Sequence, residues 1–491
     1  MLNPSTEQRE IRIEKLKKLE EMGINPYPHI YKPTSNSAKL AEKYADLPND
    51  AQTEDVVKVA GRVKAIRNSG MFMDIYDSTG KVQVFCSKEQ LPEAELAKID
   101  LIDIGDFIGV TGRVRRTKRG ELSVNADEVL FLSKSLLPLP EKFHGLQDVE
   151  TRYRQRYLDL ITNEETTKTL KNRSLIINSI RNTLTGKGIM EVETPILHPI
   201  LGGANAKPFR THHNALDMDL YLRIATELYL KKLIVGGFDG VFELGRNFRN
   251  EGISIKHNPE FTAMEVYWVY KDYYDMMDLT EELIRNAAKA VHGTAIIKYG
   301  DIEIDLERPF ERKTMIELVK EHTGIDFAKI KTYEEALAEA TRIGVKFDKI
   351  PQTWGDTLVA VFEDKVESHL VQPIHVMDHP VEVSPLTKKH RNDERLVERF
   401  ETYINTWELC NAYSELTNPL DQKERLEEQA RQREAGNDEA NEMDEDFVTA
   451  LEYGMPPTGG LGVGIDRLVM ILTNSPSIRD VIAFPTMRKK D

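Results

Sequence analysis

The sequence predicts an α+β protein with several domains, in which a small β-barrel precedes a larger mixed domain. Residues 56 to 132 contain five short β-rich runs separated by turns, and this pattern suits a small closed barrel. From about residue 151 onward, strand-like segments alternate with helix-like segments. At 491 residues, the chain is also long enough for two or three domains with a large buried core.

Residues 1 to 55 are predicted to form an N-terminal helix followed by a linker. The helix is expected over residues 5 to 22, where apolar side chains recur every three residues, at Ile13, Leu16, Leu19 and Met22. Much of its remaining surface is basic, so the helix either packs on its own protein or contacts RNA. Prolines at positions 26, 28 and 33 mark the linker.

Residues 56 to 135 are predicted to form an OB-fold barrel. Glycines at positions 61, 80 and 112 lie at its predicted bends, and five of the seven residues from 113 to 119 are basic. A basic groove combined with an exposed aromatic side chain is how OB-folds bind single-stranded nucleic acid. Phe72 is the candidate aromatic residue, and the alternative is that it belongs to the barrel core.

Residues 136 to 164 are predicted to be a linker, and residues 165 to 491 a second, mixed domain. That domain starts with a helix over residues 165 to 187 and contains a helix-rich insertion at about residues 310 to 370. The segment from 421 to 446 is rich in charged side chains, so a solvated helix and loop are expected there.

Composition and charge limit the possible classes of function. Hydrophobic residues make up 40% of the chain and charged residues 30%, which is ordinary for a soluble globular protein. The net charge of −15 argues against a protein that coats nucleic acid through bulk positive charge, but it leaves room for a local RNA-binding face. With only Cys86 and Cys410, neither a disulfide framework nor a cysteine-based zinc site is expected. No apolar run has the length of a signal-peptide core or a membrane span, so we expect a cytoplasmic protein without membrane attachment.

Three spaced segments carry the residue types that chemistry needs. The first, residues 186 to 197 (GKGIMEVETPIL), reads as a helix end, a turn and a strand. The second, residues 242 to 267, reads as strand, loop and strand, and its arginines, aromatic rings and carboxylates could contact a nucleotide and an amine. The third, residues 459 to 472 (GGLGVGIDRLVMIL), is a Gly-rich strand that enters a helix and lets backbone approach a ligand closely. Its spacing matches neither the Walker A motif nor the dinucleotide fingerprint.

In this order and spacing, the three segments resemble motifs 1, 2 and 3 of the class II aminoacyl-tRNA synthetases. The chain is most similar to the bacterial-type lysyl-tRNA synthetases along essentially its whole length, through FHGLQDVETRYRQRYLDL, GGANAKPFRTHHNALDMDLYLRIATELYLKKL, FRNEGISIKHNPEFT and EYGMPPTGGLGVGIDR. The resemblance implies a catalytic domain with a mainly antiparallel sheet flanked by helices. It also implies a lysine–tRNA ligase, which forms lysyl-adenylate from ATP and L-lysine and passes the lysyl group to the 3′ end of tRNA(Lys), releasing AMP and pyrophosphate. A homodimer built around the segment near Pro195 is implied as well.

The resemblance implies ATP-binding roles for residues of motifs 2 and 3. Arg249 matches the motif 2 arginine that binds the α-phosphate and the substrate carboxylate, and its planar donors can bridge both groups during in-line attack. Arg467 matches the motif 3 arginine that holds the γ-phosphate. Contacts with ATP are implied for Glu251 and His257, and stacking on adenine for Phe261. Without the resemblance, the two arginines could form surface ion pairs and His257 could be an ordinary loop histidine.

The cofactor implied by the resemblance is Mg²⁺, held by Glu401 and Glu408 together with the ATP phosphates. Oxygen ligands shared with phosphate suit Mg²⁺, so a complete protein cage is not expected. The two glutamates lie seven positions apart, so in one extended strand they would face opposite sides, and a bulge or bend is needed to bring them together. From the residues alone, a solvated pair is the alternative.

Selection of lysine requires an anionic pocket, because a buried ammonium without a partner is costly. The implied pocket residues are Gly203 and Glu227 at the α-ammonium, Arg249 and Asn411 at the carboxylate, and Glu265, Tyr267, Tyr413 and Glu415 at the side chain. Two residues depart from the family pattern. Thr226 replaces the Pro that usually precedes the α-ammonium glutamate, and Cys410 replaces a common Gly, which could narrow the pocket slightly.

In the barrel, the resemblance assigns recognition of the anticodon bases to Arg67, Phe72, Gln83 and Glu121. Stacking on Phe72 together with hydrogen bonds to base edges is physically sufficient for recognising a uridine-rich anticodon.

Three other functions compete with this interpretation. A relative that lysylates a translation factor would lack the barrel of residues 56 to 132. A sibling enzyme for aspartate or asparagine differs in its pocket, since aspartate needs cationic side chains where this chain supplies three carboxylates. A catalytically dead RNA-binding module predicts that the motif residues are lost, whereas Arg249, Glu401, Glu408 and Arg467 are all present.

Overall fold

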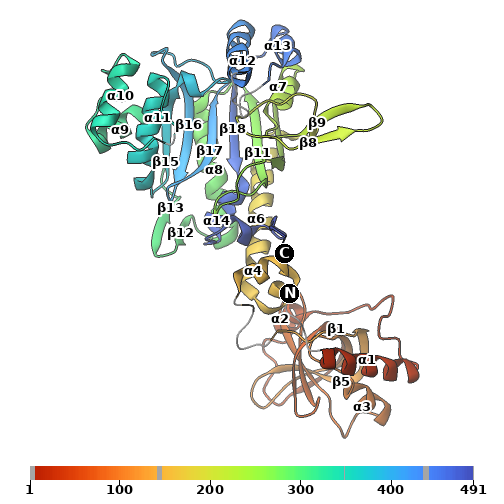
Figure 1. The fold of residues 1–491 in the computed structure, drawn as a ribbon. Coiled ribbons are helices and arrows are strands. Elements are labelled where there is room, and N and C mark those ends of the chain that lie inside the picture. Colours follow the sequence, from red (N-terminus) through yellow and green to blue (C-terminus); the bar gives the residue numbers. More distant parts are fainter. Residues whose placement is uncertain (1–5, 141–145, 147, 348, 435–441, 490–491) are drawn as a thin grey trace. The chain divides into compact units, whose positions relative to one another are not determined.

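The computed structural model describes residues 6–140, 146, 148–347, 349–434 and 442–489. The chain divides into two compact units, Met1–Leu158 and Asp159–Asp491. Each unit is described by itself (Figure 1).

The N-terminal unit is built around a closed five-stranded barrel with the strand order β1-β2-β3-β5-β4. The strands are β1 (Gln52–Arg67), β2 (Phe72–Tyr76), β3 (Lys81–Phe85), β4 (Phe107–Arg116) and β5 (Leu122–Ser133). Alternate side chains point inward and form a buried core that includes Val59, Met73, Ile75, Val84 and Val124. Helices α2 (Ser37–Lys43), α3 (Glu93–Ile99) and α4 (Val149–Arg154) complete the unit. The predicted OB-fold barrel is confirmed.

Helix α1 (Thr6–Glu21) packs on the barrel of its own unit. Arg12 donates hydrogen bonds to the backbone carbonyl groups of Ser135 and Leu137, both at 3.1 Å. Within the predicted apolar stripe, Leu19 is fully buried, whereas Met22 lies beyond the helix end and is 43% exposed. These contacts support the interpretation that the helix packs on its own protein.

An eight-stranded sheet forms the centre of the second unit, in the order β14-β15-β16-β17-β18-β11-β10-β6. Its strands are β6 (Met190–Glu191), β10 (Gly240–Phe248), β11 (Glu260–Val269), β14 (Glu311–Thr314), β15 (Ile374–Pro380), β16 (Leu396–Ile404), β17 (Trp407–Ser414) and β18 (Thr458–Gly464). Neighbouring strands are antiparallel except β14 with β15 and β6 with β10. The predicted mainly antiparallel sheet is thereby confirmed.

Helices α6 (Glu164–Gly186), α8 (Tyr273–His292) and α14 (Ile465–Leu472) pack on one face of this sheet (Figure 1). The helix predicted over residues 165 to 187 corresponds to α6. Helix α8 begins at Asp272, whose side chain forms a capping box with Asp275, and ends at Gly293 in the left-handed conformation. The sequence thus specifies both ends of α8.

Between β14 and β15 the chain forms α9 (Met315–Thr323), α10 (Tyr333–Arg342), α11 (Trp354–Lys365) and the short η1 (Glu367–His369). These helices have their own buried core, which includes Phe327, Leu358 and Phe362. They correspond to the helix-rich insertion predicted at residues 310 to 370.

The remaining elements are α5 (Arg156–Thr162), α7 (Glu227–Val235), η2 (Val381–Val383), α12 (Pro419–Glu434), α13 (Glu445–Glu452), α15 (Ile478–Val481), a three-stranded sheet of β7 (Leu197–His198), β9 (Met218–Leu222) and β8 (Arg210–His213), and a hairpin of β12 (Ile296–Tyr299) and β13 (Ile302–Asp305). The charged segment predicted as helix and loop begins in α12, in which half of the residues are exposed and Gln422, Leu426 and Gln429 are buried. Its residues 435 to 441 lie outside the described residues.

Candidate active site

A cavity of about 390 Å³ opens over β10, β11, β17 and β18. The cavity lies on the face of the sheet opposite α8. Side-chain directions alternate along β18, so Gly459 lies against Met276 of α8 and Gly460 lines the cavity. The predicted site residues that line it are Gly203, Glu227, Arg249, Glu251, His257, Phe261, Glu265, Tyr267, Glu408, Asn411, Tyr413 and Arg467. Glu401 and Glu415 do not line it and lie behind residues that do.

The hairpin of β10 and β11 brings most of these residues together. The strands pair in regular antiparallel register from Gly240 opposite Trp268 to Phe248 opposite Glu260. Because side chains alternate along a strand, Phe261, Glu265 and Tyr267 share the cavity face of β11, with buried residues between them facing α8. The strand–loop–strand prediction for residues 242 to 267 is therefore confirmed.

Arg249 lies near the middle of the cavity, immediately after β10. Its guanidinium carbon is 5.1 Å from the centre of the Phe261 ring. Burial lowers the pKa of Arg249, against the opposing effect of Glu251 and Glu408. Its Nε is buried and, within the described part of the chain, has no hydrogen-bond partner. A partly desolvated guanidinium with a free donor is suited to receive a phosphate or carboxylate oxygen.

Motif 2 and motif 3 meet at His257 and Arg467. Arg467 donates from Nη1 to the backbone oxygen of Glu408 at 2.7 Å and from Nη2 to Nε2 of His257 at 3.0 Å. A guanidinium can only donate, so Nε2 of His257 accepts and the proton lies on Nδ1, 2.8 Å from Oγ of Ser254. Burial and then Arg467 lower the pKa of His257, which agrees with a neutral ring. His257 is therefore coupled to Arg467 and is not an ordinary loop histidine.

Glu401 and Glu408 are brought together by a hairpin. They lie on β16 and β17, which are joined by a turn at Asn405 and Thr406, both with positive φ. The register places Thr402 opposite Cys410 but Tyr403 opposite Glu408, so Leu409 is an extra residue on β17. This bulge turns Glu408 to the face that Asn411 occupies. The sequence required a bend or a bulge between the two glutamates, and the structure contains both: the turn at Asn405 and Thr406 and the bulge at Leu409.

The two carboxylates are the groups that could hold a divalent cation. Tyr403 and Arg399 donate to the oxygens of Glu401 at 2.8 and 2.7 Å. Burial and then Glu401 raise the pKa of Glu408, so a cation beside the pair would relieve their repulsion. Among the described residues, no group of three or more His, Cys, Asp or Glu side chains could hold a metal by itself. The donor set therefore fits a cation whose remaining ligands come from phosphate.

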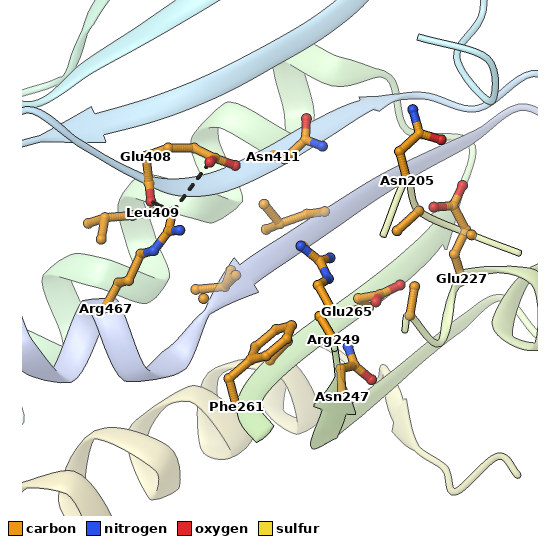
Figure 2. A pocket seen from close by; sticks show the side chains of 18 of the residues that line it. Asn205, Glu227, Asn247, Arg249, Phe261, Glu265, Glu408, Leu409, Asn411 and Arg467 are labelled. Atoms are coloured by element: carbon orange, nitrogen blue, oxygen red, sulfur yellow. Dashed lines mark hydrogen bonds and ion pairs between the residues drawn. The ribbon is translucent and has the colours of Figure 1, made fainter. Parts of the chain in front are cut away.

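The opposite end of the cavity is anionic. Tyr413 donates to both oxygens of Glu227 at 2.8 Å. Oε2 of Glu265 accepts from the Tyr267 hydroxyl at 3.1 Å. Burial and then Glu227 raise the pKa of Glu265. Glu415 is fully buried next to these residues. Figure 2 shows this division, with Arg249 and Phe261 between Glu227 and Glu265 on one side and Glu408 and Arg467 on the other.

Three residues of this region were missed by the sequence-based reasoning. Arg399 donates to Asn411 at 2.9 Å and to Glu401, so it orients two predicted residues. Asp466 accepts from the backbone N–H of Thr262 and from Arg173, both at 2.6 Å, and so fixes motif 3 against β11 and α6. Lys231 is buried beside Glu227 and Glu415. The sequence contained a weak signal for two of these residues. Asp466 is next to Arg467, and Lys231 lies one helical turn after Glu227.

The two departures from the family pattern have different outcomes. The backbone N–H of Thr226 donates to Oε1 of Glu265 at 3.1 Å, a hydrogen bond that Pro could not supply. Cys410 belongs to the apolar core beneath the sheet and does not line the cavity. The narrowing of the pocket expected from Cys410 is therefore wrong, because its side chain points away from the ligand space.

Three of the predicted anticodon residues, Arg67, Phe72 and Gln83, lie on the adjacent strands β1, β2 and β3, and Glu121 immediately precedes β5. Phe72 is half-buried, and its ring centre is 5.0 Å from that of Phe85. Its strand neighbour Met73 is fully buried in the barrel core, so Phe72 faces outward and the core alternative is wrong. Gln83, two residues before Phe85, lies on the same outer face as Phe72. The other two predicted residues form ion pairs, Arg67 with Asp74 at 2.8 Å and Glu121 with Lys81 at 2.5 Å.

Comparison with known proteins identifies the class. Residues 148–488 match the family model of the class II tRNA synthetases (D, K and N), and residues 57–132 match that of the OB-fold nucleic acid binding domain. The chain therefore belongs to the class II tRNA synthetase family. It is 54% identical to the lysine–tRNA ligase of Sinorhizobium medicae over 99% of this chain and 98% of that protein. It is 50% identical to the lysine–tRNA ligase of Staphylococcus epidermidis over the full length of both chains. The resemblance to bacterial-type lysyl-tRNA synthetases is confirmed.

Within the described residues, no helix is long and apolar enough to cross a membrane.

Proposed function

We propose that this chain is a lysine–tRNA ligase, which joins L-lysine to tRNA(Lys) with ATP. The observation that carries the proposal is the polarity of the cavity. One end gathers Glu227, Glu265 and Glu415, while Arg249 and Arg467 lie at the middle and the other end. Lysine has two ammonium groups and one carboxylate, so the anionic end suits its amines and Arg249 suits its carboxylate. An aspartate pocket would need the opposite charge.

The first step forms lysyl-adenylate. ATP lies along motifs 2 and 3, with adenine against Phe261 and the γ-phosphate at Arg467, and Glu251 and His257 provide further contacts. The lysine carboxylate attacks the α-phosphorus in line, the bond to the bridging oxygen breaks, and pyrophosphate leaves. Arg249 contacts both the carboxylate and the α-phosphate, so it orients the attack and stabilises the charge that develops. No enzyme nucleophile is needed.

The second step transfers the lysyl group. A terminal ribose hydroxyl of tRNA(Lys) attacks the carbonyl carbon of the adenylate, AMP leaves, and the aminoacyl ester remains on the tRNA. The pocket supports this step by holding both ammonium groups of the lysyl moiety, at Glu227 and Gly203 for the α-amine and at Glu265, Tyr267 and Glu415 for the side chain. The carbonyl carbon is thereby kept in place.

A divalent cation, for which we propose Mg²⁺, would be held by Glu401 and Glu408. When bound, it would neutralise charge on the phosphates. Arg399, which donates to Glu401 and to Asn411, keeps both acceptors oriented toward that space. Asn411 in turn contacts the substrate carboxylate.

The barrel recognises the anticodon in this proposal. Phe72 stacks on a base, and Arg67, Gln83 and Glu121 supply hydrogen bonds to base edges. Arg115 lies over the Phe85 ring at 4.8 Å, which places a cation beside the stacking surface.

The chain also forms a homodimer in the cytoplasm in this proposal. The apolar side chains Met190, Ile196 and Leu197, which flank Pro195, are 43%, 46% and 44% exposed. A second copy of the same surface would cover them through a two-fold interface.

Amino-acid-dependent exchange between ATP and labelled pyrophosphate tests the proposal. The full chain is assayed with lysine, ornithine, arginine, aspartate and asparagine, and then for charging of tRNA(Lys). We expect exchange with lysine to exceed that with each of the others. Exchange that requires aspartate or asparagine, or the absence of exchange with lysine, would overturn it. Exchange with lysine but no charging of tRNA(Lys) would point instead to another acceptor.

A further inference from the structure

A lysine of the protein itself is buried behind the anionic end of the cavity. Lys231 lies on α7, and its side chain is fully buried. Lysine is almost never fully buried unless it is paired. Here Nζ lies 2.5 Å from Oε1 of Glu227 and forms a second ion pair with Oε2 of Glu415. The rings of Tyr267 and Tyr413 lie 5.8 and 5.6 Å from the same nitrogen. The ammonium is thus enclosed by the very residues that are expected to receive the substrate.

The charges at this end fit the substrate only when Lys231 is counted. When ionised, Glu227, Glu265 and Glu415 supply three negative charges and Lys231 supplies one positive charge, so the pocket then carries two uncompensated negative charges. L-Lysine brings two ammonium groups. Its carboxylate is balanced separately by Arg249. Because unpaired buried charge is costly in either direction, a pocket of this composition matches a diamine and neither a monoamine nor a trivalent cation.

The geometry leaves one carboxylate oxygen open for the substrate. Oε2 of Glu415 faces Lys231, whereas Oε1 is buried and lacks a hydrogen-bond partner among the described residues. Gly460 lies beside Oε1, and a methyl group there would be only 1.9 Å from it. The missing side chain of Gly460 therefore leaves the space that Oε1 occupies, next to a residue that lines the cavity.

We propose that Lys231 is a positioning residue for lysine selectivity: it is the fixed counter-ion that pairs with Glu227 and Glu415 and orients them, so that the pocket accepts a substrate with two ammonium groups. This inference rests on the proposed lysine–tRNA ligase function. Lys231 acts through the two glutamates and touches neither ATP nor the reacting carboxylate.

This role predicts that binding of lysine depends on pH. The ionisable groups that face Lys231 are Glu227 on α7, Tyr267 on β11, Tyr413 on β17 and Glu415 after it, whereas α13 contributes the apolar ring of Phe447. Burial raises the pKa of Glu415 well above its usual value, and Lys231 is the principal group that lowers it. Without Lys231, the carboxyl would hold its proton to higher pH, and lysine would have to displace that proton to bind.

The test measures KM for lysine and for ATP in pyrophosphate exchange, with Lys231→Gln, Lys231→Arg and the control Lys232→Gln. Lys232 is the next residue of α7 and is largely covered, and it pairs with Asp444 at 3.6 Å and with the exposed Asp446 at 2.7 Å, so its change removes the same charge outside the pocket. For Lys231→Gln we expect KM for lysine to rise by about tenfold or more at pH 7, with KM for ATP within about twofold of wild type. The rise should be larger at pH 6 than at pH 8.5, and Lys231→Arg should recover part of it. The control should match wild type.

A second comparison keeps the test decisive if Lys231→Gln alone does not fold. In a Glu415→Gln background, the pocket has lost one negative charge, so removing Lys231 restores two uncompensated negative charges. Lys231→Gln should therefore lower KM for lysine in that background, although it raises KM in the wild-type background. A side chain that only stabilised the fold would raise KM or reduce the active fraction in both.

Several results would overturn the inference. These are an unchanged lysine KM in Lys231→Gln, an equal rise of both KM values, a rise that does not depend on pH, or a further rise when Lys231 is removed from the Glu415→Gln enzyme. Wild-type enzyme without lysine-dependent exchange would instead refute the proposed function, so the two failures are distinguishable.

Discussion

Gly460 offers a direct test of where the side-chain ammonium of the substrate lies. An added Cβ at this position would lie 1.9 Å from Oε1 of Glu415 and 2.8 Å from a ring carbon of Tyr267. Neither neighbour is free to move, since Glu415 is paired with Lys231 and Tyr267 donates to Glu265. Gly460→Ala should therefore force the carboxylate away from the position at which it would receive the substrate.

The size of the effect follows from the overlap. Overpacking of a well-packed site costs about 1 to 3 kcal/mol, and displacement of Glu415 also disturbs a buried ion pair. Taking about 2 kcal/mol as the loss, kcat/KM for lysine should fall roughly thirtyfold. Gly464, at the proposed ATP end, lies four positions after Gly460, about 13 Å along a strand, so KM for ATP should stay within about twofold.

The assay is pyrophosphate exchange with lysine and ATP varied in turn, together with urea unfolding. Gly462→Ala is the matched control for folding, because an added Cβ there comes no closer than 3.6 Å to another residue, at the backbone oxygen of Asn411. Its free energy of unfolding should equal or exceed that of wild type. A Gly460→Ala enzyme with wild-type kcat/KM for lysine would refute the placement of the ammonium beside Glu415.

Three further predictions concern the barrel, a family departure and acid stability. Phe72→Ala should weaken charging of tRNA(Lys) and leave lysine-dependent pyrophosphate exchange nearly intact, because Phe72 lies in the barrel unit; equal losses in both assays would contradict the separate roles. Thr226→Pro removes the N–H that donates to Glu265 and raises the pKa of that carboxyl further, so KM for lysine should rise about fivefold, corresponding to about 1 kcal/mol, and more at pH 6 than at pH 8; an unchanged KM at both would count against it. Burial lowers the pKa of His379 well below its usual value, so its contribution to stability is present above its unfolded pKa and is lost as the pH falls. Below about pH 6.5, the free energy of unfolding should drop by about 1.4 kcal/mol per pH unit from this residue, and urea unfolding of His379→Gln should show a slope shallower by that amount.

Sequence reasoning was accurate where local patterns dominate. The hairpin of β10 and β11, helix α6 and the five barrel strands all follow from period-two or helical patterns bounded by turn residues. The same alternation put Phe72 on one face of its strand without saying which face was inside. That question depends on how the barrel closes, which no short segment determines.

The site was less predictable because its pairings span long distances along the chain. Whether Glu401 and Glu408 converge depends on the extra residue Leu409 in the register of β16 and β17. Arg399 lies in a charged stretch of the sequence, and only the folded sheet brings it against Asn411 and Glu401. A register or a long-range ion pair is a property of the folded chain, so residue type and spacing alone could not supply it.

In the proposed function, strand β11 carries both the adenine contact and part of the pocket for the side-chain ammonium of lysine. Phe261 and Tyr267 are six residues apart on the same face, which is about 20 Å along an extended strand. Tyr267 lies opposite Gly460 and Glu265 opposite Gly462 in the pairing with β18, so backbone hydrogen bonds set the distance between Phe261, the proposed adenine contact, and Tyr267 in the proposed ammonium pocket. A shift of register by one residue would turn every one of these side chains to the core. If Arg249 and Glu415 bind the two ends of lysine as proposed, a shorter diamine would reach Glu415 only by moving its carboxylate away from Arg249.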